Sequence, residues 1–194
     1  MHDVLDGVVQ YEMKLLLQHL IDNYTTMEEI HTRIKNFNYG YVEKANKPPE
    51  VKLVQKTNDV ELNAIQSWSL LRNLPLVSGD LVCPNDQHWY LILLLLQMVN
   101  IVFSPLLSKG IANFLKQLIA EHRRLFKHLY PNKRLIPKHH FMVHYPTCIL
   151  EIGPLLHTWC MRYEAKHIYI FFKQVNSSKN ITKTLAKKHQ SQMA

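Results

Sequence analysis

The sequence is poor in glycine, and its few cysteines form no pattern. Its 194 residues include only 5 glycines and 3 cysteines, Cys83, Cys148 and Cys160. An odd number of cysteines without a short-range spacing pattern excludes a small scaffold held together by disulfides. The chain also opens without the charged stretch, apolar run and small-residue cleavage site of a signal peptide. We therefore expect a reduced, intracellular protein, either nuclear or cytoplasmic.

Long hydrophobic runs are also missing. The most apolar stretch, residues 89–103, is interrupted by Gln97 and Asn100. It falls short of the roughly 20 apolar residues that a transmembrane helix needs. The sequence therefore predicts a buried core helix here, and no membrane partner.

Several common functional motifs are absent as well. The sequence contains no glycine-rich phosphate loop, no Cys-x-x-Cys pattern, no Gly-x-Ser-x-Gly elbow and no His-Glu-x-x-His pair. These absences exclude the commonest nucleotide-binding, zinc-finger, hydrolase and metalloprotease classes. The functional signals that remain are less direct.

Apolar residues recur at helical spacing, which together with the low glycine content predicts a mainly α-helical fold. Thr26 with Glu29, and Asn58 with Glu61, have the spacing of capping boxes that begin helices. We expect helices over residues 3–22, 26–36, about 58–75, 86–104 and 108–130, with a loop at about 38–57. The last two helices should pack as an antiparallel pair, and strand should be confined to a short C-terminal segment at most.

Positive charge is concentrated in the C-terminal third. The formal net charge is +8, and residues 121–194 hold 13 Lys and Arg against 3 acids, whereas residues 1–120 hold 10 against 12. Lys and Arg gain binding free energy by displacing counterions from phosphates, so this asymmetry predicts weak, non-specific DNA binding. We divide the chain into a helical region, 1–130, and a basic, histidine-rich segment, 131–194. The candidate DNA-binding residues are Arg162, Lys166, Lys173, Lys183, Lys187 and Lys188.

Two segments carry residues suited to chemistry. If a helix begins at Pro137, His140 and His144 lie on one face, where two imidazoles can share a metal ion. The alternative is that one of them packs in the core while the other faces solvent. Glu164 is a single acid among basic and aromatic neighbours, so it should stay ionised, and it can equally be a salt-bridged helix residue.

An ordered set of short motifs resembles transposases of the CACTA (En/Spm) type, in particular animal genomic copies of these elements. The motifs are MHDVLDG at 1–7, IPKHHFMVHYP at 136–146, GPL at 153–155, WCMRYEAKH at 159–167, NI at 180–181 and TLAKKHQ at 184–190. The resemblance extends in order over nearly all of the chain.

The resemblance implies an RNase H-like nuclease of the Asp-Asp-Glu group, in which three carboxylates hold two Mg²⁺ or Mn²⁺ ions. It implies that Glu164 is the third catalytic acid, which follows a helical insertion. It aligns His2 with the histidine of the family's Asp-x-x-His motif. It also groups His2 with His140 and His144 as a metal-supporting cluster, for which zinc is the candidate ion.

The resemblance also places the family's two catalytic aspartates upstream of Met1. We therefore expect a truncated transposase fragment, DNA-binding in origin, that retains the helical insertion and the acidic helix but not the cleavage chemistry. Asp3 and Asp6 are interpreted as acids that stabilise a helix N-terminus. Two alternatives are a domesticated nucleic-acid-binding module and a helical protein-interaction module that self-associates through apolar surface.

The purified chain should neither nick DNA nor join DNA ends in the presence of Mg²⁺ or Mn²⁺, because Glu164 lacks its two aspartate partners. Incubation with supercoiled plasmid, followed by gel electrophoresis, measures this. Metal-dependent cleavage that disappears in Glu164→Gln would contradict the expectation.

Overall fold

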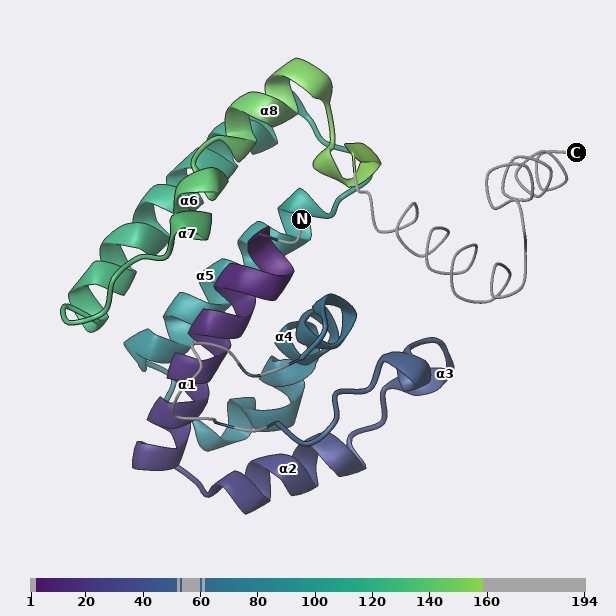
Figure 1. The fold of residues 1–194 in the computed structure, drawn as a ribbon, viewed down its shortest axis with the longest axis vertical. Helices are drawn as coiled ribbons and strands as arrows, with labels where there is room; N and C mark the ends of the chain where they lie inside the picture. The colour runs from purple at the N-terminus through teal and green to yellow at the C-terminus, as the bar shows by residue number, and fades with distance from the viewer. Residues whose placement is uncertain (1–2, 52, 54–59, 61, 159–194) are drawn as a thin grey trace, which may run out of the picture. The chain divides into compact units, whose positions relative to one another are not determined.

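The computed structural model describes residues 3–51, 53, 60 and 62–158. These residues form helices joined by loops, with no strand in the described ranges, so the predicted mainly α-helical fold is confirmed (Figure 1). The chain divides into a unit of residues 1–157 and a second of residues 158–194. The short strand allowed near the C-terminal motifs falls almost entirely outside the described residues.

The N-terminal helix begins with an unusual turn. Residues Val4–Val9 form a π-helical segment, η1, which continues directly into α1 (Gln10–Asn23) (Figure 1). A β-carbon on Gly7 would overlap the side chain of Lys138, whose Nζ donates a hydrogen bond of 3.2 Å to the Asp6 carbonyl. Glycine at position 7 therefore gives the Lys138 side chain room to reach the Asp6 carbonyl. The predicted helix over 3–22 is confirmed, but its π-helical start was not foreseen.

The next helix begins at the residue that the sequence predicted. In α2 (Met27–Asn36), the Thr26 side chain accepts a hydrogen bond from the Glu29 backbone N–H at 3.3 Å. The expected loop at 38–57 contains a short helix, α3 (Gly40–Glu43), and a 3₁₀ turn, η2 (Lys44–Asn46). The prediction that this region is only a loop is therefore wrong.

The fourth helix differs from the prediction at both ends. α4 (Ala64–Ser78) is capped by Asn63, which forms a reciprocal capping box with Gln66. The predicted cap, Asn58, lies outside the described residues. The helix passes Pro75 and ends three residues later in the 3₁₀ turn η3 (Gly79–Leu81), so the predicted stop near Pro75 is one turn early. Pro75 has no N–H to donate to the carbonyl of Leu71, but the helix continues past it for three residues.

The apolar run forms the expected core helix. α5 (Gln87–Val102) is buried along most of its length, and α6 (Lys109–Leu129) packs against it. The Tyr90 hydroxyl, in the first turn of α5, donates to Glu121 in the second half of α6 at 2.9 Å, so the two helices are antiparallel as predicted. Among the described helices, none is both long and apolar enough to cross a membrane.

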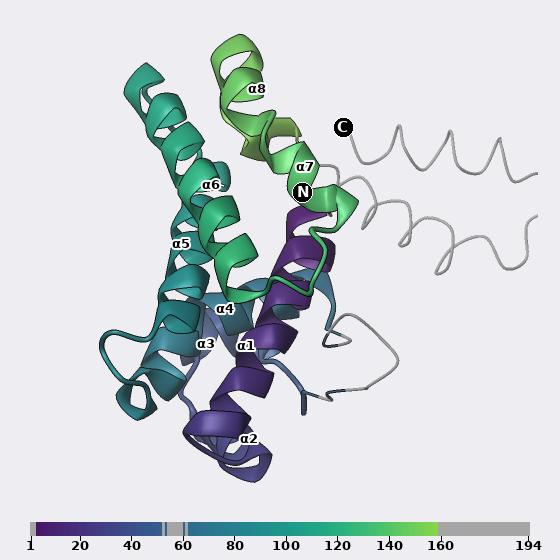
Figure 2. The same ribbon diagram turned by 90° about the vertical axis from the view of Figure 1, so that its left-hand side faces the viewer.

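Two short helices complete the first unit. α7 (Pro137–Met142) packs against η1, and α8 (Tyr145–Ile152) packs against α6 (Figure 2). A final 3₁₀ turn, η4, spans Leu155–Thr158. Residues 131–157 therefore share one compact unit with the preceding helices. The division of the chain near residue 130 stays a prediction.

The apolar core lies between the N-terminal helix, α4, α5 and α6. Phe126 on α6 is fully buried, with its ring centroid 6.1 Å from that of Tyr11 and 5.2 Å from that of Tyr130. Other fully buried side chains are Leu5, Met13, Leu16, Leu17, Leu20, Ile30, Leu70, Leu71, Leu74, Leu95 and Met98.

Replacing Phe126 by alanine should lower the free energy of unfolding by about 3–5 kcal/mol, because it leaves a cavity in the core. The matched control is Phe114→Ala on the same helix, where the side chain is 39% exposed. That change should cost less, about 1–2 kcal/mol, because the ring is only partly buried and leaves no closed cavity. Urea denaturation of both variants measures the difference, and equal losses would show that Phe126 does not anchor the core.

Candidate functional site

A buried carboxylate joins three helices. Glu12 on α1 is 2% exposed, and its two oxygens contact two histidine rings that are each 1% exposed. Oε2 lies 2.8 Å from Nε2 of His122 on α6, and Oε1 lies 2.8 Å from Nε2 of His139 on α7. One side chain therefore fixes the relative positions of α1, α6 and α7.

The charges of this network follow from its contacts. Burial alone would raise the pKa of Glu12, but the adjacent His122 and His139 outweigh burial and lower it, so the carboxylate is ionised. His139 Nδ1 is buried without a hydrogen-bond partner. Because an ionised carboxylate only accepts hydrogen bonds, both rings donate to Glu12 through Nε2.

The Glu12 network has no route to a substrate. All three side chains are sealed from solvent, and both carboxylate oxygens are occupied by histidine. Its function in the molecule is therefore to hold the helices together.

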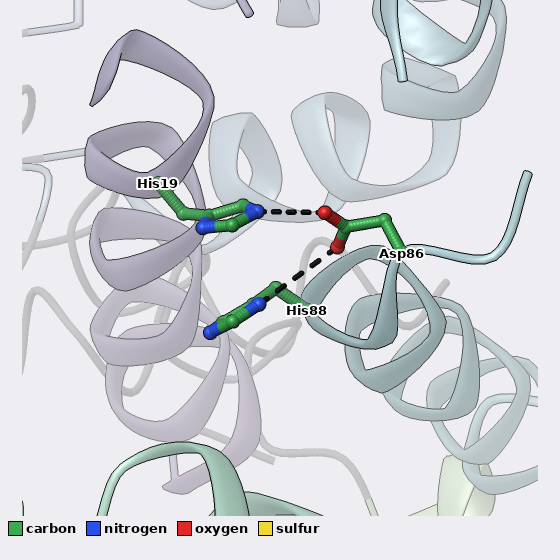
Figure 3. A group of neighbouring side chains, drawn as sticks. All are labelled: His19, Asp86 and His88. Carbon is green, nitrogen blue, oxygen red and sulfur yellow. Dashed lines mark hydrogen bonds and ion pairs between the residues drawn. The ribbon is translucent and has the colours of Figure 1, made fainter. Parts of the chain in front are cut away.

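A second polar cluster lies where α1 meets the start of α5 (Figure 3). Asp86 is the N-cap of α5, and its Oδ1 accepts a hydrogen bond of 2.8 Å from the Trp89 backbone N–H. Its Oδ2 lies 2.8 Å from Nε2 of His19 and accepts a hydrogen bond of 2.8 Å from the Tyr24 hydroxyl. The ring of His88 stacks on that of His19, with centroids 3.9 Å apart and planes inclined by 19°.

Within this cluster the carboxylate is ionised and His88 is neutral. Burial would raise the pKa of Asp86, but hydrogen bonds from His19, the Trp89 N–H and Tyr24 lower it. Burial lowers the pKa of His88, and the nearby His19 lowers it further against the opposing effect of Asp86. His88 Nδ1 lies 3.9 Å from Asp86 Oδ1, which is too long for a hydrogen bond.

The cluster brings together atoms that are able to ligate a metal. Among the described residues, His19, Asp86 and His88 form a group whose ligand-type atoms all lie within 4.8 Å of one another. Two imidazoles and one carboxylate are a donor set that zinc and other first-row transition metals use. The side chains are only partly buried, so solvent and small ions have access to them.

The predicted histidine pair is adjacent in space. His140, near the end of α7, and His144, just before α8, have Nε2 atoms 3.3 Å apart, and both side chains are exposed. That distance suits a hydrogen bond between the rings as well as a shared ion. No third ligand-type residue of the described ranges joins the pair. The predicted partner His2 lies outside the described residues, so the cluster of His2, His140 and His144 stays a prediction.

The remaining predicted site residues lie outside the described part of the chain. They are the catalytic-type Glu164 and the basic residues Arg162, Lys166, Lys173, Lys183, Lys187 and Lys188.

A row of cations follows one face of α6. Lys116, Arg123 and Lys127 recur at helical spacing, and Arg124 lies beside them. A shallow hollow lies over the small side chain of Ala120. Arg123, Arg124 and Lys127 line the rest of it. None of the four cations forms an ion pair with a carboxylate of the described residues. The predicted basic surface thus begins within α6.

Sequence analysis missed the two polar clusters. Asp86 was recognised as a helix start, but its contact with His19 spans 67 positions and has no local signal. One feature of the sequence could have indicated this cluster: Asp86 and His88 are both able to ligate a metal and lie close together at the start of the same helix. Glu12 also had a signal, since it interrupts the apolar face formed by Val8 and Leu16.

Comparisons of the chain with family models, curated proteins and solved structures find no match. The resemblance to CACTA transposases therefore depends on the sequence motifs alone.

Glu12→Gln should destabilise the fold by about 3 kcal/mol at neutral pH, because it replaces the ionised acceptor shared by two buried histidine N–H groups and leaves one of them without an acceptor. The pKa of Glu12 in the folded state is below its ordinary value of 4.5. The carboxylate's contribution is therefore complete above pH 4.5 and is lost as the pH falls through the folded pKa. The difference in unfolding free energy between wild type and variant should shrink accordingly in urea titrations from neutral to acidic pH.

Glu28→Gln is the control for this prediction, because Glu28 is exposed on α2. It should change stability by no more than about 0.5 kcal/mol at any of these pH values. A Glu12→Gln effect that stays constant down to acid pH would show that the ionised carboxylate is not the source of the stability.

Proposed function

We propose that the protein binds DNA without sequence preference, with the cationic row on α6 as part of its binding surface, and that it derives from a CACTA-type transposase. The observation that carries the binding proposal is the row itself. Four cations without acidic partners in the described residues lie together on one helix. Such a row has a free-energy cost from mutual repulsion that a polyanion would relieve.

The spacing of the row suits a phosphate backbone. With a rise of about 1.5 Å per residue, Lys116 and Arg123 are separated by about 10 Å along the helix, and Arg123 and Lys127 by about 6 Å. Double-stranded DNA carries a negative charge for about every 1.7 Å of its axis, so several phosphates can lie opposite the row. The hollow over Ala120 gives a phosphate group room between the flanking cations.

This binding surface offers contacts to phosphate more than to bases. Lys and Arg that contact phosphates fix the position of a protein on DNA but carry no sequence information. The expected affinity is therefore that of non-specific binding, with a Kd of roughly 10⁻⁴ to 10⁻⁶ M at physiological salt. The basic residues predicted to bind DNA beyond residue 158 would add further phosphate contacts of the same kind.

The proposed transposase origin is supported by the ordered motifs and by the helical character of residues 3–152. In this proposal, Mg²⁺ or Mn²⁺ belongs to the three catalytic acids of the family, and this chain supplies Glu164 as one of them. A domesticated module would share the DNA binding without turnover. Cleavage assays therefore test whether the chain retains transposase chemistry, while binding assays test whether the cationic row on α6 contacts DNA.

A second candidate function is protein interaction, including self-association. The exposed apolar side chains that favour it lie on and between α7 and α8: Phe141, Val143, Leu150 and Ile152. Exposed apolar side chains are typical of interaction surfaces where they form a contiguous patch. Sedimentation that depends on protein concentration, without DNA affinity, would favour this function over the first.

The double variant Arg124→Gln/Lys127→Gln should weaken DNA binding and reduce its dependence on salt. The plot of log K against log salt has a negative slope, and each lost phosphate contact should make it shallower by about 0.9. Fluorescence anisotropy with a labelled 20-base-pair duplex, repeated over a series of salt concentrations, measures both quantities. Duplexes of unrelated sequence should behave alike.

The matched control is Lys35→Gln/Lys44→Gln, which removes the same charge from exposed residues of α2 and the turn after α3. Equal losses in the two double variants would show that net charge, and not the α6 row, decides the affinity. Affinity that does not change with salt would contradict the proposal altogether.

A further inference from the structure

We propose that His19, Asp86 and His88 bind one divalent transition-metal ion, with Zn²⁺ as the best fit. This site is separate from the histidine pair on α7 and α8, and it does not depend on the proposed DNA binding. It joins α1 to the N-terminus of α5 (Figure 3).

The ligand atoms are close to the spacing that zinc requires. In a tetrahedral site with bonds of about 2.0–2.2 Å, neighbouring ligand atoms lie about 3.4 Å apart. Here Asp86 oxygens lie 2.8 Å from His19 Nε2 and 3.9 Å from His88 Nδ1, values on either side of that spacing. The ligand-type atoms of the three residues all lie within 4.8 Å of one another, so a rearrangement of the side chains without movement of the helices can bring them to ligand spacing.

His88 is the ligand that must turn. A metal ion lies near the plane of each imidazole that ligates it, whereas the rings of His19 and His88 are stacked 3.9 Å apart and nearly parallel. The His88 ring also contacts Tyr130 edge-on, with centroids 5.3 Å apart, so it must turn away from both aromatic neighbours to bind an ion. No hydrogen bond to a described residue holds its ring nitrogens in the present orientation. Binding should therefore unstack the two rings.

Metal binding requires a particular tautomer of His19. Its Nε2 now contacts the carboxylate, and its Nδ1 lies 3.2 Å from the side-chain amide of Asn23. To give the Nε2 lone pair to a metal, His19 must carry its proton on Nδ1. The Asn23 amide would have to turn its oxygen toward that proton, which gives up the 2.9 Å hydrogen bond that Nδ2 donates to the His19 carbonyl. This places a hydrogen-bond acceptor behind the ligand, as metal-binding histidines usually require.

Asp86 is already oriented by two neighbours that are not ligands. The Trp89 backbone N–H holds Oδ1 and the Tyr24 hydroxyl holds Oδ2, so the carboxylate keeps its direction when His19 moves. Three protein ligands leave a fourth position for water. Two imidazoles and a carboxylate favour zinc, cobalt, nickel or copper over magnesium and calcium, which prefer oxygen ligands throughout.

The other histidine clusters are weaker candidates. Glu12 offers no free oxygen, since His122 and His139 occupy both. His140 and His144 supply two ligands without a third among the described residues. The experiment must therefore separate the proposed site from the His140/His144 pair.

The test uses the full chain and titrates it with Co²⁺, whose visible absorption reports tetrahedral coordination, followed by competition with Zn²⁺. Two variants remove ligands with small structural change. His88→Phe keeps an aromatic ring on His19 but has no ring nitrogen, and Asp86→Asn keeps a good N-cap but loses the anionic ligand. Each should weaken metal affinity at least 10-fold. The double variant His140→Ala/His144→Ala should leave this affinity unchanged.

Two further measurements distinguish the loss of a ligand from misfolding of a variant. Far-UV circular dichroism shows whether each variant is folded, and histidine ring signals in NMR spectra of the wild type should shift for His19 and His88 when Zn²⁺ is added. Wild-type affinity in both folded ligand variants, or binding that only the His140/His144 variant abolishes, would overturn the proposal. Unshifted His19 and His88 signals at saturating Zn²⁺ would overturn it as well.

Discussion

The carboxylate of Glu12, buried between His122 and His139, is the interaction on which the arrangement of the helices depends. A charged group in the core is costly unless its partners are in place, so the folded state requires α1, α6 and α7 to meet at this one point. Apolar packing alone would tolerate helices that slide or rotate by a residue. The two 2.8 Å contacts of Glu12 remove that freedom.

The same helix carries the second cluster. Glu12 and His19 are seven residues apart, two turns along one face of α1, so the position that Glu12 fixes against α6 also sets where His19 meets Asp86. The stiff apolar helix α5 holds Asp86 and His88 at its first turn. The buried network and the partly exposed cluster are therefore connected through one helix, so the backbone positions of His19 and Asp86 stay fixed while the histidine rings rearrange.

Much of the helical layout could be predicted from the sequence, because its causes are local. Thr26 and Asp86 cap the helices that they were expected to begin, and the apolar run of α5 is buried as predicted. Polar contacts between distant residues could not be predicted in this way. Nothing near Glu12 in the sequence indicates that His122 and His139 would supply its partners. Pro75 was overestimated as a stop, since α4 continues past it to Ser78.

The contact between Gly7 and Lys138 links two positions far apart in the chain. The lysine stem occupies the space where any larger residue at position 7 would place its side chain, and its ammonium group satisfies the Asp6 carbonyl in the π-helical turn. A larger residue at position 7 would push the flexible lysine stem aside and break the hydrogen bond to the Asp6 carbonyl. A change at the very start of the described chain would then loosen the attachment of α7, whose Lys138 lies 132 positions away from Asp6.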